Sequence, residues 1–289
     1  MKIALDKHIL VKGETYAEGS GMLQDFTSPY SATVANKLIE AGMEISHIGD
    51  GEAGISLCAK KGSVYIKPTY GTVSKFGVVA HASSMDTVGV YANSLDEAFA
   101  VMSVVAGHDK NDTMYPAEKY EYTAGGIDPG GLKIADSPIL KYKKYFEPVY
   151  MIISSAEFCG NTARFDGIKF GYRAKNHKNT DELVTNSRSE SFTAEEKLKT
   201  LMGTYVLSEG QYEKYYHKAM QLRRLIKKEA DELFGRYDCA VFPISDESSA
   251  LAYLTGCPAV FAEGKMIMAK EFGENKLFAF GKSFLKGGS

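Results

Sequence analysis

The chain has 289 residues, 44% of them hydrophobic, which is enough to bury one substantial core or at most two small ones. Its formal net charge of −2 excludes the strongly basic surface that is typical of direct nucleic-acid binding. No apolar run reaches the length of a membrane span and no targeting signal opens the chain, so we expect a cytoplasmic protein without membrane contact.

The cysteines and histidines give no sign of a metal or cofactor site. The cysteines are widely spaced, without a CxxC pair, at Cys58, Cys159, Cys239 and Cys257. The histidines show no HxxxH or HxH spacing. We therefore predict free thiols in a reducing compartment, no metal and no cofactor.

The first part of the chain alternates between strand and helix patterns. Residues 1–11 contain two short apolar segments and predict a strand or a strand pair. Residues 31–41 predict an amphipathic helix that Ser31 caps and Gly42 ends. Three side chains are expected on its apolar face: Val34, Leu38 and Ile39. Residues 45–52 begin with the pattern of another strand, and Gly49 and Gly51 end that pattern.

The middle of the chain contains one clear helix and one irregular segment. Residues 95–105 have helical spacing after the start signal at Ser94. Residues 114–147 lose this periodicity, so we predict an irregular surface excursion with a single strand at residues 132–135. An apolar helix follows from residue 149.

Helix signals dominate the last third. Thr193 and Glu196 form a capping box that opens one helix. A second capping box, Ser208 with Gln211, predicts a long helix over residues 211–234. We interpret its four basic side chains as a solvated face: Arg223, Arg224, Lys227 and Lys228.

Residues 238–243 then predict a buried strand, and residues 251–262 a helix, a turn and a strand. Because strand and helix patterns alternate, the fold class is α/β, with a mixed β-sheet flanked by helices. We expect one domain over residues 1–289.

The stretch at residues 66–86, IKPTYGTVSKFGVVAHASSMD, carries a specific motif. KPTYG-x-VS-x-FG-x-VA-x-ASS-x-D resembles the amidase signature family, most closely the A subunits of glutamyl-tRNA(Gln)/aspartyl-tRNA(Asn) amidotransferases. Further segments follow in the family's order, including FDGIKFGY, SRSE and GTY. The resemblance implies a reduced amidase-signature fold over most of the chain.

The catalytic positions of that family look lost. The family hydrolyses an amide with a serine nucleophile, a second serine and a lysine, because a serine hydroxyl attacks only when a base takes its proton. The resemblance places the lysine position on Asp6 and the nucleophile position on Ala53 or Gly54, neither of which has a hydroxyl. The glycine- and serine-rich run that supplies the second serine is absent.

Other serines are weaker catalytic candidates. Ser83 and Ser84 lie close to His81 and Asp86, which raises the hypothesis of a Ser/His/Asp triad. Neighbours in one loop seldom have triad geometry, and in the family this turn supports the site. Ser56 is a further candidate as a displaced nucleophile, whereas Lys67 is expected to support the local fold.

The substrate-binding positions also depart from the family. Its basic pair before GT corresponds to Leu198 and Lys199, so Lys199 offers a point charge without the bidentate fork of arginine. The acidic loop after the strand ending at Pro243 is shortened, and Asp246 or Glu247 could replace its carboxylate.

Two hypotheses about function follow from the resemblance. The first is a non-catalytic protein, similar to the amidotransferase A subunits, that has a structural or regulatory role in a complex, with B- and C-type subunits or another protein as partners. The second is an active amidase, or a glutamine-dependent amidotransferase component, that hydrolyses a C–N bond with rearranged or partner-supplied residues. Loss of all three catalytic positions favours the first.

Overall fold

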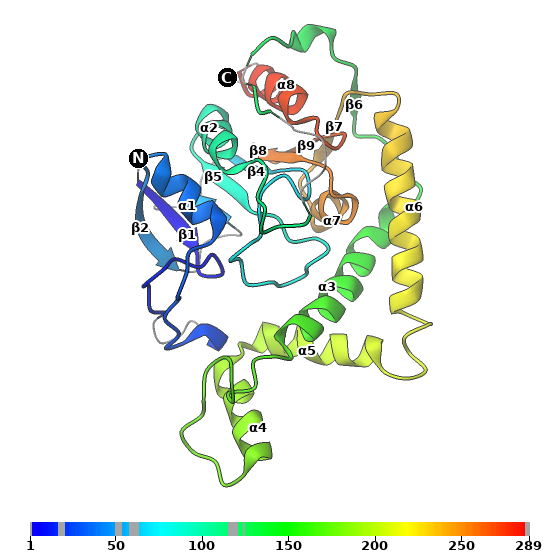
Figure 1. The fold of residues 1–289 in the computed structure, drawn as a ribbon. Coiled ribbons are helices and arrows are strands. Elements are labelled where there is room, and N and C mark those ends of the chain that lie inside the picture. Colours follow the sequence, from blue (N-terminus) through cyan, green and yellow to red (C-terminus); the bar gives the residue numbers. More distant parts are fainter. Residues whose placement is uncertain are drawn as a thin grey trace.

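The computed structural model describes residues 2–16, 21–49, 54–57, 64–114, 121–123 and 125–286. In this part of the chain nine strands form one sheet in the order β2-β1-β3-β5-β4-β8-β9-β7-β6 (Figure 1). Three neighbouring pairs, β1/β2, β3/β5 and β6/β7, are parallel, and the other five are antiparallel. The strands are β1 (Lys2–Asp6), β2 (Glu44–Gly49), β3 (Gly54–Ser56), β4 (Val64–Lys67), β5 (Gly89–Ala92), β6 (Ile134–Asp136), β7 (Cys239–Pro243), β8 (Ala259–Ala262) and β9 (Lys265–Ala269).

Helices cover both faces of this sheet. They are α1 (Thr33–Glu40), α2 (Leu95–Val105), α3 (Phe146–Thr162), α4 (Thr180–Ser191), α5 (Ala194–Leu207), α6 (Tyr216–Phe234), α7 (Asp246–Thr255) and α8 (Glu274–Lys286). One hydrophobic core joins the sheet to α1, α2 and α8, and a second joins it to α3, α6 and α7. The predicted α/β class with a mixed sheet and flanking helices is therefore confirmed.

Strand β7 illustrates how the sequence creates these two cores. Cys239 and Val241 belong to the core with α1, α2 and α8, while Ala240 and Phe242 belong to the core with α3, α6 and α7. Successive side chains of a strand point to opposite faces, so a continuous apolar run is needed where both faces are covered. The buried strand predicted at residues 238–243 has this property.

Two helix starts follow directly from capping chemistry. The hydroxyl of Ser94 accepts the backbone N–H of Glu97 at 3.2 Å and begins α2. At α5, Thr193 and Glu196 exchange side-chain and backbone hydrogen bonds, which is the predicted capping box. Both predictions are confirmed. The sequence could predict these caps because each one depends on residues within four positions of one another.

The start and the buried face of α1 differ from the prediction. Its N-cap is Ala32, without a side-chain cap, because the Ser31 hydroxyl instead accepts the backbone N–H of Lys12 at 2.9 Å. Val34 and Leu38 are buried as expected, but Ile39 is 49% exposed.

The long helix α6 begins five residues later than predicted, at Tyr216 rather than at residue 211. Ser208 ends α5, and its hydroxyl donates to the carbonyl of Tyr205 at 2.7 Å. The backbone N–H of Gln211 donates to the carbonyl of Ser208 at 3.1 Å rather than to its hydroxyl, and residues 209–215 form turns before α6 begins. The predicted capping box of Ser208 and Gln211 is therefore wrong.

The segment at residues 114–147 contributes to the sheet as well as to the surface. Its strand β6 pairs with β7 in parallel at the sheet edge, one to two residues later than the predicted strand. Leu140 and Phe146 near its end are buried against the second core.

Helices α3 and α5 pack at very short range, and Gly203 makes this possible. A Cβ at this position would lie 2.2 Å from the backbone oxygen of Ser155 and 2.6 Å from the Cβ of Cys159. In Figure 1 the two helices cross below the sheet, with α4 beyond them. The contact fixes α5 against α3, the helix that supplies one wall of the site described next.

Candidate functional site

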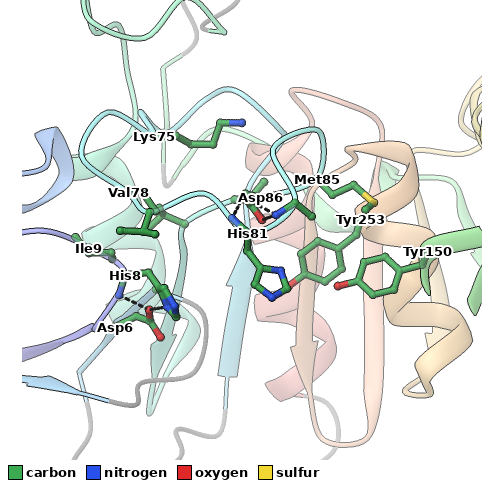
Figure 2. Close-up of a pocket in the computed structure, with 15 residues that line it drawn as sticks. Asp6, His8, Ile9, Lys75, Val78, His81, Met85, Asp86, Tyr150 and Tyr253 are labelled. Atoms are coloured by element: carbon green, nitrogen blue, oxygen red, sulfur yellow. Dashed lines mark hydrogen bonds and ion pairs between the residues drawn. The ribbon is translucent and has the colours of Figure 1, made fainter. Parts of the chain in front are cut away.

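A cavity of about 310 Å³ lies where β1 and β3 approach the loop between β4 and β5 (Figure 2). The end of β1 contributes Asp6, the following turn His8, and β3 its first residue, Gly54. The loop at residues 75–88 forms most of the wall, and α3 and α7 add Tyr150 and Tyr253. This volume is at the small end of pockets that bind small molecules.

Asp6 and His8 form a hydrogen-bonded pair at the cavity. The carboxylate Oδ1 of Asp6 lies 2.8 Å from the backbone nitrogen of His8 and 2.7 Å from its ring Nδ1. Asp6 was expected only as the position of a missing lysine, and His8 was not singled out. The turn after β1 brings the His8 ring back onto the carboxylate, which a pattern of alternating strand faces does not predict.

His81 and Asp86 also line the cavity, but they do not form a catalytic pair. The Asp86 carboxylate accepts the backbone N–H groups of His81 and Ala82 at 2.9 Å. The His81 ring packs on Phe158, with 4.6 Å between ring centroids. Burial lowers the pKa of His81, and the positive charge of Lys199 lowers it further. His81 is therefore mainly neutral near pH 7.

Ser83 and Ser84 lie outside the cavity and anchor the loop. The Ser83 hydroxyl accepts a hydrogen bond from Nδ2 of Asn161 in α3 at 2.9 Å. The Ser84 hydroxyl accepts a hydrogen bond from Nη1 of Arg223 at 2.6 Å, and the Ser84 carbonyl accepts one from Nη2 at 2.8 Å. No hydrogen bond joins either serine to the His81 ring within the described residues, so the structure does not form the hypothetical triad.

Arg223 corrects the interpretation of the α6 basic residues as a solvated face. Besides its bonds to Ser84, its Nε donates to the carbonyl of Leu254 in α7 at 2.9 Å. Burial lowers the pKa of Arg223, while the carboxylate of Glu157 opposes that shift. Arg223 thus ties the ASS-x-D turn to two helices, a long-range role that the spacing along α6 does not reveal.

Of the two positions proposed for the lost nucleophile, Gly54 cannot hold a side chain. Its φ of +141° is strained for any other residue, and a Cβ would lie 2.4 Å from the carbonyl oxygen of Gly89 on β5. Ala53 lies outside the described residues. Ser56 follows on β3 and pairs with Ala4 and β5, and it does not line the cavity.

The two predicted substrate-binding residues are not brought together. Lys199 on α5 forms an ion pair with Glu195 at 2.8 Å and is near enough to His81 to influence its pKa. Asp246 lies in the first turn of α7, about 10 Å along the helix from the cavity residue Tyr253. Its neighbour Glu247 pairs with Lys143 at 3.3 Å, away from this cavity.

Lys67 is fully buried behind the cavity, as a residue that supports the local fold would be. Its Nζ donates to the carbonyls of Cys257 and Pro68 at 2.9 and 3.2 Å and lies 5.3 Å from the ring centre of Tyr253. Burial lowers the pKa of Lys67 to about 8 from its ordinary value of 10.5. The ammonium is thus held by backbone carbonyls in the core.

The Lys67 environment predicts a specific pH dependence of stability. Between pH values of about 8 and about 10.5 the unfolded chain binds this proton more than the folded chain does, so stability rises with pH. We expect urea unfolding to show a gain of up to about 3 kcal/mol in wild type relative to Lys67→Met over this range. Tyrosines and cysteines titrate in both proteins, so the difference between the unfolding free energies of wild type and Lys67→Met removes their contribution. Parallel curves for the two proteins would contradict the buried charged lysine.

The sequence patterns did not single out His8, Tyr150 and Tyr253 as residues of the site. Tyr150 and Tyr253 come from α3 and α7, and their ring centroids lie 5.9 Å apart. Among the residues that the structure describes, no three His, Cys, Asp or Glu side chains gather as metal ligands. None of the described helices is long and apolar enough to cross a bilayer.

Comparison with known proteins places this chain in a family. The family model described as Amidase matches residues 58–137 and 128–253. The chain is 30% identical to the glutamyl-tRNA(Gln) amidotransferase A subunit of Lactococcus lactis, over 84% of this chain and 68% of that protein. The corresponding protein of Carboxydothermus hydrogenoformans is 29% identical, over 83% of this chain and 67% of that protein. The chain therefore spans about two thirds of the length of these relatives.

Solved structures agree with this assignment. The glutamyl-tRNA(Gln) amidotransferase A subunit of Thermotoga maritima superimposes with a TM-score of 0.71 at 21% identity, over 98% of this chain and 82% of that chain. Peptide amidase of Stenotrophomonas maltophilia superimposes with a TM-score of 0.70 at 15% identity, over 97% of this chain and 82% of that chain. At these identities the likeness concerns the fold, and the family follows from the sequence matches. The chain belongs to the amidase family.

Proposed function

We propose that this chain is a divergent homologue of the amidotransferase A subunits that does not perform serine-based amide hydrolysis and has a structural or regulatory role in a cytoplasmic complex. The observation that carries this proposal is the lining of the cavity. No serine is among its described residues, and Asp6 stands where the resemblance places the catalytic lysine. In the family the lysine takes the proton of the nucleophile through the second serine, and the described lining offers neither of these serines.

Each remaining serine candidate has a structural task. Ser83 and Ser84 hold the loop through Asn161 and Arg223, and Ser56 sits in strand β3. Lys67 is the buried lysine nearest the cavity residues, but its Nζ is bound to backbone carbonyls. These contacts support the absence of an activated hydroxyl.

The role in a complex is supported by the relatives and by one helix surface. The relatives are A subunits of glutamyl-tRNA(Gln) amidotransferases. In this chain α5 carries exposed apolar side chains, with Leu198 64% and Leu201 69% exposed. Neighbouring exposed apolar side chains are typical of surfaces that contact another protein. B- and C-type amidotransferase subunits are the partners that we propose.

A second candidate function is a working amidase, or a glutamine-dependent amidotransferase component, with rearranged or partner-supplied catalytic residues. The Asp6–His8 pair favours it, because an imidazole held by a carboxylate is a competent general base. Direct attack of water on an unactivated amide without a positioned acid for the leaving amine is slow, so we place this candidate second.

Ammonia release tests the proposal. The purified chain would be incubated with glutamine, asparagine and simple amides, alone and with the B and C subunits of the Lactococcus lactis amidotransferase, whose own A subunit serves as the active control. We expect background ammonia in both settings and recovery of a stable complex. Ammonia release that Ser56→Ala or Ser84→Ala abolishes would overturn the proposal. Release that appears only with the partners would establish the second candidate instead.

A further inference from the structure

The Asp6–His8 pair has the geometry of a general base that lines the cavity. An ionised carboxylate only accepts hydrogen bonds, so the 2.7 Å contact places a proton on Nδ1 of His8. The ring Nε2 is then the basic nitrogen. The second bond, from the backbone N–H of His8 to the same Oδ1, fixes the carboxylate. The two side chains are only 13% and 28% exposed.

The opposite side of the cavity carries hydrogen-bond donors. Figure 2 shows the His81 ring between the Asp6–His8 pair and the hydroxyl ends of Tyr150 and Tyr253. Burial raises the pKa of Tyr150 to about 12, so its hydroxyl keeps its proton.

The charges and walls of the cavity favour a small uncharged ligand. Ile9, Val78 and Met85 supply apolar surface. The one lysine among the described lining residues, Lys75, uses its Nζ to donate to the carbonyl of Ser83 and the hydroxyl of Tyr70. These two acceptors are neutral, so Lys75 keeps its positive charge. The described lining carries two carboxylates, Asp6 and Asp86, against this one ammonium group, and the excess negative charge disfavours an anionic ligand.

We propose that this cavity hydrolyses small uncharged esters, with His8 as the general base and Asp6 as its positioning residue. This activity lies beyond the proposed role in a complex and needs no serine. Nε2 of His8 takes a proton from water while the water oxygen bonds to the ester carbonyl carbon. Collapse of the tetrahedral intermediate breaks the ester C–O bond and releases the carboxylic acid and an alkoxide. The alkoxide takes the proton back from His8 and leaves as the alcohol.

Ester chemistry suits this cavity better than amide chemistry does. An alkoxide or phenoxide leaves without prior protonation, whereas an amine leaves only after it gains a proton from a positioned acid. The hydroxyl of Tyr150, a lining residue, can donate to the oxygen that becomes negative in the intermediate. The cavity volume of about 310 Å³ limits the substrate to a short acyl group and a small alcohol.

The test uses p-nitrophenyl acetate and the full chain. We expect saturable release of p-nitrophenolate, and His8→Gln is expected to lower kcat/KM about 100-fold. His217→Gln is the matched control, because His217 lies in the first turn of α6, pairs with the exposed Glu213 at 2.5 Å and does not line the cavity. It should leave the rate unchanged. Full activity of His8→Gln, or an equal loss in His217→Gln, would overturn the proposal. Circular dichroism and a second variant, His8→Asn, exclude misfolding as the cause of a loss.

The role of Asp6 is read from kcat and KM. In Asp6→Asn the side-chain amide can donate to Nδ1 of His8, which leaves the proton on Nε2, so kcat should fall while KM stays close to that of wild type; Asp6→Glu should restore part of the rate. An unchanged kcat in Asp6→Asn would remove Asp6 from the proposal.

Ammonia from glutamine, measured in the same samples, separates the two proposals. Ester hydrolysis with background ammonia supports both. Failure to hydrolyse the ester overturns this inference alone, and ammonia release that depends on a serine overturns the proposed function alone.

Discussion

Replacing Gly54 by serine is expected to lower the free energy of unfolding by about 4 kcal/mol and to leave the protein without amidase activity. The variant would install a hydroxyl at one of the two positions that the resemblance assigns to the nucleophile. A φ of +141° strains any side chain, and the new Cβ would lie 2.4 Å from the Gly89 oxygen. Because β3 and β5 are paired there, the strand cannot yield without breaking the sheet.

A second variant gives the cost of a side chain at a positive φ in open space. Gly264 has a φ of +74° in the turn between β8 and β9, and a Cβ there would meet nothing within 4 Å. Gly264→Ser is expected to lose about 1 kcal/mol, from backbone strain alone. Urea denaturation of both variants measures the difference. Equal decreases in the free energy of unfolding would show that the close approach of Gly54 and Gly89 does not affect stability.

Replacing Gly203 by alanine is expected to lower the free energy of unfolding by about 3 kcal/mol, although alanine is the better helix former. The added methyl group would overlap the Ser155 oxygen at 2.2 Å and the Cys159 Cβ at 2.6 Å. Both atoms belong to the α3 helix, so relief requires that α3 and α5 move apart. Thermal and urea unfolding of the variant measure this effect.

Gly160 is the control for helix propensity. It lies in α3, is exposed and has nothing within 4 Å of a Cβ, so Gly160→Ala should raise the free energy of unfolding by about 0.5–1 kcal/mol. A loss of unfolding free energy in Gly203→Ala together with a gain in Gly160→Ala supports the close packing of the two helices. A stabilised Gly203→Ala would contradict it.

The elements that the sequence predicts well are those with local causes. The helix start at Ser94 and the capping box at Thr193 depend on residues within one turn, and both occur as predicted. Ser208 has the same local pattern but caps no helix, because the backbone N–H of Gln211 donates to the carbonyl of Ser208 at 3.1 Å and residues 209–215 form turns. A cap signal therefore predicts well only where the backbone that follows it enters the helix directly.

The site depends on contacts that no local pattern encodes. Arg223 and Ser84 are 139 positions apart in sequence, and their bond turns an apparently solvated arginine into an anchor for the loop. Tyr150 and Tyr253 reach the cavity only through the packing of α3 and α7 against the sheet. The family motif located the loop correctly, whereas the pairing of Asp6 with His8 needed the geometry of the turn after β1.

The central claim, that the cavity has no activated serine, is tested most directly with a fluorophosphonate probe and intact-mass measurement. Such probes bond covalently to serines whose hydroxyl is activated by a base. The chain, alone and with the B and C subunits proposed as partners, should remain at its unmodified mass, while a serine hydrolase included as a positive control should gain one adduct. A stoichiometric adduct on this chain that maps to Ser56, Ser83 or Ser84 would contradict the account and show that a serine hydrolase site exists.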